Sequence, residues 1–294
     1  MPTNLGKLGV WSFIDNLTGP EVAAFARRLE DWGYGALWIP EAVGRDPFTT
    51  ISFLATQTEK LVLATGICNI YARDAMSMNA IHKTLSELAP GRFVLGMGVS
   101  HAPLVSDIRG HDYKKPVSTM RAYLDGMASS LFMSVEAEEP APIVLAALRT
   151  NMLKLAAEKA RGAHPYFVPP EHTAKARETL GPDAWLCPEQ MVLLETDAEK
   201  ARAIARQHMA TYIDLPNYRN NLLELDFEEA DFDNGGSDKL VDAIVAWGDE
   251  DTIRARIQAH WDAGADHVCI QPFKNDGEMG ADEKLLDLLA PARG

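Results

Sequence analysis

Short apolar runs without polar alternation recur along the chain, and between them apolar residues return at helical spacing. Such runs are typical of parallel strands buried on both faces, and the spacing between them predicts helices. The predicted strands are residues 8–13, 36–39, 61–64, 93–98, 143–147, 162–168, 185–194 and 265–272. We expect the seventh of these strands to bend at Pro188.

The alternation of predicted strands and helices is clearest in residues 61–101. After the strand at 61–64, Asp74 is predicted to cap a helix that Pro90 and Gly91 bring to an end. The strand at 93–98 completes a βαβ unit. Because eight strands alternate with helices, the expected fold is a single-domain (β/α)8 barrel over residues 1–294, with an open doubly wound sheet as the alternative.

Residues 217–248 exceed what a barrel connection needs, and we expect them to form an insertion before the last helix and strand. The segment is acidic and carries Glu224, Asp226, Glu228, Glu229, Asp231 and Asp233 in a short span. A solvated acidic excursion is the favoured interpretation. The alternative is a lid over the barrel mouth.

Charge and cysteine content narrow the class of protein. With 28 Lys and Arg against 42 Asp and Glu, the formal charge is −14, which argues against nucleic-acid and anionic-membrane partners. The three cysteines are scattered, so we expect no disulfide framework and a reducing, cytoplasmic location. No signal peptide or membrane span is expected.

The carboxyl ends of the strands carry the candidate chemistry, since ligands bind there in parallel barrels. Two strands end in small or polar residues, at Thr65-Gly66 and at residues 98–101. His101 follows the fourth strand, and an imidazole that titrates near neutrality suits proton exchange. Glu41 ends the second strand and is a second acid or base candidate. No metal-ligand motif occurs, so no metal is expected.

Several segments, in order, resemble the bacterial-luciferase-like oxidoreductases. They are GYGALWIPE at 33–41, LATGICNI at 63–70, PGRFVLGMGVS at 90–100, the AA…MLKLAAEKARGA block at 146–163, and WGDEDTI at 247–253. The resemblance is strongest to the branch that uses the deazaflavin coenzyme F420. The chain departs from that pattern at Arg161, where Asp is usual, and at Ala42, where some relatives place a catalytic histidine.

The resemblance implies hydride transfer between coenzyme F420 and a small organic substrate, with a cis peptide bond at Gly66-Ile67 in the cofactor slot. An arginine at a helix start suits the phosphate of the cofactor. The predicted cofactor-binding residues are Gly66, Ile67, Asn69, Gly98, Val99, Ser100, Ala147, Arg149, Gly162, Ala163 and His164. A basic lip for the anionic tail is expected from Arg73, Lys114 and Lys115.

Two alternatives stay open at this point. One is an FMN-dependent monooxygenase that uses molecular oxygen, and the other is a barrel that binds a flavin or deazaflavin without turnover. The resemblance also implies a homodimer packed through helices near the second to fourth strands, a surface compatible with Met76, Met78 and Ile81.

Overall fold

The computed structural model describes residues 2–293, and its sheet is built almost entirely from the predicted apolar runs. The strands are β1 (Leu8–Trp11), β2 (Ala36–Ile39), β3 (Val62–Thr65), β4 (Cys68–Asn69), β5 (Phe93–Gly98), β6 (Ile143–Leu145), β7 (Gly162–Ala163), β8 (Trp185–Leu186), β9 (Glu189–Leu194), β10 (Val245–Gly248) and β11 (Val268–Phe273). The α-helices are α1 (Gly19–Asp31), α2 (Pro47–Ala55), α3 (Ala75–Leu88), α4 (Pro116–Ser129), α5 (Thr150–Lys159), α6 (Pro170–Leu180), α7 (Ala198–Met209), α8 (Pro216–Leu223), α9 (Asp238–Ile244), α10 (Glu250–Asp262) and α11 (Glu283–Leu288).

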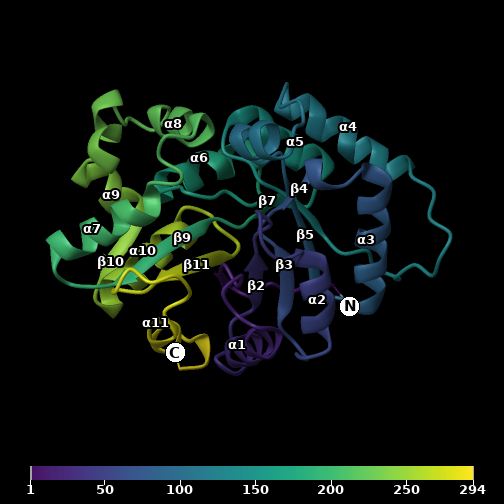
Figure 1. Cartoon of the computed structure of the whole chain (residues 1–294), viewed down its shortest axis with the longest axis horizontal. Coiled ribbons are helices and arrows are strands. Elements are labelled where there is room, and N and C mark those ends of the chain that lie inside the picture. Colours follow the sequence, from purple (N-terminus) through teal and green to yellow (C-terminus); the bar gives the residue numbers. More distant parts are fainter. Residues whose placement is uncertain (1, 294) are drawn as a thin grey trace.

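The strands pair in parallel in the order β10-β9-β11-β1-β2-β3-β5-β6-β7-β8, with β4 paired to β5. The sheet curls so that its carboxyl edge, here called the mouth, opens upward between α8 on one side and α4 on the other (Figure 1). The predicted α/β class is confirmed, and the parallel sheet is curled into a half-barrel. The strand pairing ends at β10 and β8 among the described residues, so closure into a complete (β/α)8 barrel stays a prediction.

The segment from Trp185 to Leu194 bends as predicted and contributes strands to two separate parts of the sheet. Its first part, β8, pairs with β7, while the amides of Asp266 and His267 donate to the carbonyl of Leu186. After Cys187 and Pro188 the segment continues as β9, which pairs with β11. The bend therefore moves the chain away from β7 and lets β9 accept a further neighbour.

That neighbour is β10, and it corrects the predicted insertion. Residues 245–248 had been assigned to an excursion, but they pair in register with Met191–Leu194 of β9. The preceding residues form α8, a 3-10 stretch at Glu229–Gly235 and α9. Their apolar side chains pack with β9 in a hydrophobic cluster that includes Tyr218, Leu222, Phe232 and Val241. The segment is therefore not a solvated excursion, although its acidic side chains remain mostly exposed.

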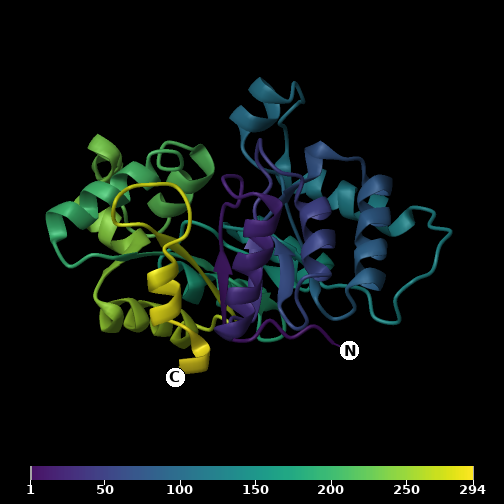
Figure 2. The same ribbon diagram turned by 60° about the horizontal axis from the view of Figure 1, so that its bottom comes forward.

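One further predicted boundary was wrong. Residues 162–168 contribute only Gly162 and Ala163 to the sheet, because Pro165 has no N–H to donate and Phe167 adopts a φ of 61°. The segment after β5 contains a π-helix, Pro103–Ile108. This segment stands above the rest of the sheet in Figure 2, where it forms the teal projection at the top.

Candidate functional site

The cofactor-slot segment 66–69 lies directly beside the end of β5. Cys68 pairs with Met97 and Asn69 pairs with Gly98, so residues predicted from two separate strands meet at one edge of the sheet. The Gly66-Ile67 peptide bond is cis, as the family resemblance implied. The indole Nε1 of Trp11 donates to the carbonyl of Gly66 at 2.6 Å. The structure thus brings Gly66, Ile67 and Asn69 together with Gly98.

Gly98 leaves bare backbone at this point of the mouth. A Cβ at this position would lie 2.7 Å from Cδ1 of Ile67 and 3.0 Å from the Cβ of Ala146, closer than side chains pack. Beyond it, Ser100 adopts a φ of 56°, and its carbonyl accepts a hydrogen bond from Tyr113 at 3.1 Å. The turn that carries Val99 and Ser100 is therefore fixed by its own backbone and by one phenol.

Glu41 holds this segment in place. One of its carboxylate oxygens accepts from the amide of Asn69 at 2.9 Å, and the other pairs with Arg73 at 2.7 Å. Its own amide donates to the carbonyl of Ile67 at 3.1 Å. Arg73 also pairs with Asp46, so it is neutralised by two carboxylates and is not available as part of the predicted basic lip. Of that lip, Lys114 is exposed and pairs with Asp112.

His101 follows β5 at the mouth and is bound by α8. Its Nδ1 lies 3.2 Å from the amide oxygen of Asn217, so with that oxygen as the acceptor Nδ1 carries the proton. Its Nε2 lies 3.5 Å from the hydroxyl of Tyr218, and the two rings are in tilted contact with centroids 5.3 Å apart. Burial lowers the pKa of His101, while the hydrogen bond to Asn217 opposes that shift. The imidazole is therefore neutral at neutral pH, with Nε2 as its acceptor.

A group of aromatic rings joins His101 to the interior of the sheet. Tyr166 contacts Tyr212 and Tyr218 at centroid distances of 5.1 and 6.1 Å, and its hydroxyl donates to the side-chain oxygen of Gln271 at 2.9 Å. Beneath these rings lies Glu189, with only 1% of its surface exposed. One of its oxygens accepts from the amide of Phe167 at 3.3 Å, and the other has no hydrogen-bond partner among residues 2–293. Burial raises the pKa of Glu189 to about 8.

The remaining predicted residues come from β6, β7 and α5. Arg149 is the N-cap of α5, half exposed, and its guanidinium lies 3.7 Å from Glu224. Ala147 and Ala163 are buried. Gly162 has a packing reason to be glycine, because a Cβ there would lie 2.0 Å from the carbonyl oxygen of Trp185.

His164 lies in the interior of the curled sheet rather than on an open rim. Its ring stacks on Trp38 with centroids 4.5 Å apart, and its Nδ1 donates to the carbonyl of Cys187 at 2.7 Å. Burial lowers its pKa to about 4, so the ring is neutral. With 2% of its surface exposed, it is placed to support the slot from within.

Sequence reasoning missed the side chains that reach the site from distant segments. They are Trp11, Tyr71, Arg109, Tyr113, Tyr166, Glu189, Tyr212, Asn217 and Tyr218. Arg109 comes after the predicted strand at 93–98, so an inventory of polar residues after that strand would have found it. Tyr166 was placed inside the predicted strand 162–168, and it follows the strand only because the observed β7 ends at Ala163. Asn217 and Tyr218 had no such signal, since only the folded position of α8 brings them to His101.

A hollow of about 390 Å³ opens at one side of the mouth. It lies between the ends of β1 and β11, where Ser12 and Phe13 face Lys274 and the segment 280–284. The described residues contain no group of three or more His, Cys, Asp or Glu side chains that could hold a metal ion. Within residues 2–293, no helix is long and apolar enough to cross a membrane.

The chain is similar to known proteins in sequence and in fold. A 5,10-methylenetetrahydromethanopterin reductase of Methanolobus tindarius is 26% identical over 84% of this chain and 89% of its own length. A Mycobacterium tuberculosis protein, provisionally named as a coenzyme F420-dependent oxidoreductase, is 30% identical over 119 residues. That match covers 40% of this chain and only 33% of the relative.

Solved structures with the same fold include enzymes that differ in cofactor. A coenzyme F420-dependent tetrahydromethanopterin reductase from Methanopyrus kandleri superposes with a TM-score of 0.74 over 97% of both chains, at 18% identity. An FMN-bound Baeyer–Villiger monooxygenase component of Pseudomonas putida superposes with a TM-score of 0.68 over 97% of both chains, at 14% identity. The family model of the luciferase-like monooxygenases matches residues 7–267, and the chain therefore belongs to that family.

Proposed function

We propose that this protein is an oxidoreductase that transfers a hydride between coenzyme F420 and a small organic substrate. The observation that carries the proposal is the donor at the cofactor slot. Asn69 is fully buried, its amide nitrogen Nδ2 has no partner among the described residues, and it lies beside the bare backbone of Gly98. A buried donor without a partner costs free energy, and a flat heterocycle with carbonyl edges would satisfy it.

The residues at the mouth fit such a cofactor. Gly66, Asn69, Gly98 and Ser100 would hold the heterocycle, and the start of α5 with Arg149 would hold its phosphate. When bound, a deazaflavin supplies the carbon that gives or takes the hydride. The Mycobacterium tuberculosis relative and the solved Methanopyrus kandleri reductase are both named for coenzyme F420, which supports this cofactor over FMN.

The side chains of the protein would align the substrate and move one proton. His101, neutral and with Nε2 unprotonated, would accept the proton of an alcohol as it is oxidised and return it in the reverse direction. Glu41 has both oxygens engaged, so we now assign it to positioning the 66–69 segment rather than to proton transfer. The segment that carries α8 would exclude water above His101, which is the lid role considered for it.

Cofactor titration tests the proposal. Purified protein is titrated with coenzyme F420 and, separately, with FMN, while absorbance follows binding. We expect saturable binding of F420 and loss of its oxidised absorbance when a panel of primary and secondary alcohols is added. Tight uptake of FMN with no response to F420 would instead support the monooxygenase, and F420 binding with no turnover in either direction would support a binding protein.

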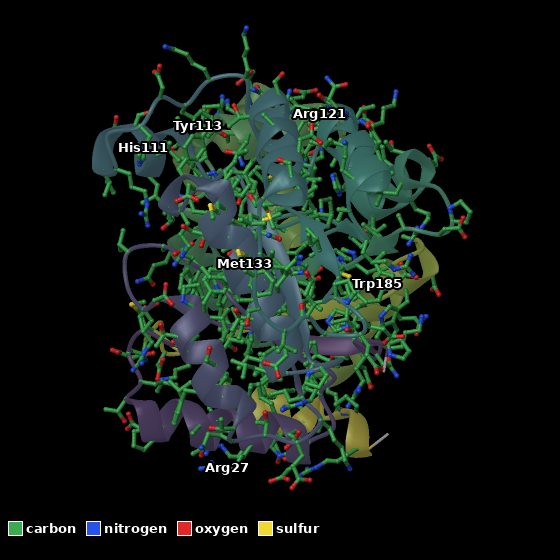
Figure 3. All side chains as sticks on the ribbon, turned by 90° about the vertical axis from the view of Figure 1, so that its right-hand side faces the viewer. Arg27, His111, Tyr113, Arg121, Met133 and Trp185 are labelled. Atoms are coloured by element: carbon green, nitrogen blue, oxygen red, sulfur yellow. The ribbon has the colours of Figure 1, made fainter. Side chains whose placement is uncertain are left out.

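We also propose a homodimer. Exposed apolar side chains gather on the face that carries α2, α3 and the loop after α4, and Met133 lies in the middle of that face (Figure 3). Met78, which had been considered for this surface, is fully buried in the core, so it is not an interface residue. Met76 is 58% exposed and stays compatible with the interface.

A further inference from the structure

The rim of the mouth between the β2 and β5 connections carries two arginines in different electrostatic situations. Arg73 pairs with Glu41 and Asp46, and its guanidinium lies over the ring of Phe48, 4.7 Å from the centroid. Arg109, which follows the π-helix after His101, forms no ion pair with any carboxylate of residues 2–293. The charge of Arg73 is thus compensated inside the protein, and that of Arg109 is not.

Arg109 reaches toward Ala42, which follows β2. Its Nη2 makes one long hydrogen bond, 3.4 Å, to the carbonyl of Ala42. Its Nε is buried and has no partner within the described chain. The contact is to the backbone of Ala42, whose own side chain is a single methyl group. A half-buried guanidinium with a buried, unpaired N–H is costly unless a ligand compensates it.

A second unpaired donor lies in the same neighbourhood. The hydroxyl of Tyr71 is buried and has no partner in residues 2–293, whereas the unpaired Nδ2 of Asn69 is assigned above to the heterocycle of the cofactor. The backbone amide of Tyr71 donates to the side-chain oxygen of Asn69 at 2.9 Å. The ring of Tyr71 lies 6.1 Å from that of His111 and 6.2 Å from that of Tyr113. His111 and Tyr113 appear close together at the upper left of Figure 3.

We infer that Arg109 and Tyr71 form a subsite for a negatively charged group, a carboxylate or a phosphate, of the substrate. A cluster of donors that includes a guanidinium calls for an anion with several acceptor oxygens. The subsite rests on the proposed function, because it assigns a substrate class to the same mouth. The phosphate of the cofactor has its own candidate partner in Arg149 at the start of α5, after β6. Arg109 instead follows the π-helix after β5 and contacts the carbonyl of Ala42, beyond β2.

The net charge of the molecule supports a role for Arg109 in anion binding. With a formal charge of −14, the surface as a whole repels anions, so an anionic substrate would need a local cation that no carboxylate neutralises. Arg109 meets that requirement, while Arg149 and Lys114 each lie near an acidic side chain. Discrimination in favour of anionic substrates would then take place at this rim, beside His101, the candidate proton-transfer residue.

The binding test uses the cofactor-free full chain and inorganic phosphate as the probe. Thermal unfolding is followed across a phosphate titration at constant ionic strength, for the wild type, Arg109→Gln and Arg27→Gln. Arg27 is a matched control on α1, where it donates to Gln57 at the exposed surface. We expect phosphate to stabilise the wild type and Arg27→Gln, and its apparent affinity to fall about tenfold or more in Arg109→Gln.

A second variant distinguishes the loss of the anion site from a folding defect caused by removal of Arg109. Ala42→Asp would supply an internal carboxylate next to Arg109, so it should suppress phosphate stabilisation while keeping the arginine. Equal phosphate stabilisation in all four proteins would overturn the subsite. The readout is independent of turnover, so failure of the subsite would leave the F420 proposal intact, and the reverse also holds.

A titration with the cofactor then decides whether the anion that binds at Arg109 belongs to the substrate or to the cofactor. Arg109→Gln is titrated with coenzyme F420 and with the deazaflavin riboside that lacks the phosphate and tail. Unchanged affinity for both, with phosphate binding lost, supports a substrate subsite. A loss of affinity confined to the phosphate-bearing cofactor would overturn that assignment and give Arg109 to the cofactor.

Discussion

At the scale of single residues, His101 shows how folding selects one protonation state. Its pKa is lowered by burial, and the amide oxygen of Asn217 fixes the proton on Nδ1. Nε2 is thereby left as an acceptor, which a proton-accepting role requires. His82, by comparison, is buried in α3 with its Nε2 at 2.8 Å from the carbonyl of Ala141, where it serves packing.

Replacement of His101 tests its role. We expect His101→Ala to lower kcat by about 10²- to 10⁴-fold, with the affinity for F420 changed by less than about threefold. The wild type should lose activity as pH falls and His101 becomes protonated, at a pH below the ordinary range for histidine. The variant should lack this acidic limb. An unchanged kcat and an unchanged pH profile would remove His101 from the mechanism.

Glu189 should make the stability of the protein depend on pH. Its pKa is about 8 in the folded state, where burial favours the protonated form, against an ordinary value of 4.5. Between these two pH values the folded state holds a proton that the unfolded state releases, so the free energy of unfolding falls as pH rises, by up to about 1.4 kcal/mol per pH unit. Below the ordinary value, and above the folded one, this contribution is flat.

The Glu189→Gln variant isolates that contribution. The amide oxygen of glutamine can still accept from Phe167, so the packing is retained. Chemical unfolding of both proteins between pH 5 and pH 8.5 should show the variant gaining stability relative to the wild type as pH rises, on the order of a few kcal/mol in total. Parallel curves across that range would show that the carboxyl is already ionised at neutral pH.

Much of the candidate site could be predicted residue by residue because parallel strands end at a common edge. His101 was chosen because it follows an apolar run. Asn69 and Gly98 were predicted through the family resemblance, and the register of β4 on β5 brings these two together. Glu189 could not be found in this way. Its sequence context, Cys187-Pro188-Glu189, gives no sign that the carboxyl points into an apolar interior, and that depends on the bend of the whole segment.

At the scale of elements, the contact of β5 with the 66–69 segment depends on glycine. Gly98→Ala would place a methyl group 2.7 Å from Ile67 and 3.0 Å from Ala146, so one of these segments must shift. We expect a loss of about 1–3 kcal/mol of stability and a weakening of F420 binding, measured by chemical unfolding and by absorbance titration. Gly19→Ala in α1, where no atom lies within 4 Å of the new Cβ, should be close to neutral in both measurements.

Strands β9 and β10 show which parts of the sheet the sequence pattern could predict and which it could not. The bend at Pro188 was predictable, because proline interrupts a strand that is otherwise continuous. Strand β10 was not, because Val245–Gly248 is short and follows α9 without a loop, so the four residues read as the end of a helical stretch. Only the open edge of β9 makes them a strand.

At the scale of the whole molecule, the single-domain organisation and the cytoplasmic location stay predictions, and the proposed dimer can be tested directly. The loop after α4 exposes three apolar side chains, Leu131, Met133 and Val135, at 68%, 87% and 73% of their surface. On a chain with a formal charge of −14, water-exposed apolar side chains on a projecting loop are costly unless a second copy covers them.

A double variant, Leu131→Asp with Met133→Asp, should therefore dissociate the dimer without unfolding the protomer, since neither side chain contributes to the core. Light scattering coupled to size exclusion would give the mass of each protein, for comparison with 32.3 kDa for one chain. Met279→Asp is the matched control, because Met279 is 66% exposed but lies beyond β11, where its carbonyl accepts from Asn16 near the mouth. A wild type that elutes as a monomer would refute this interface, and so would a double variant that keeps the dimer mass. The loop is separated along the chain from residues 66–101, so either result would leave the proposals for the mouth to their own tests.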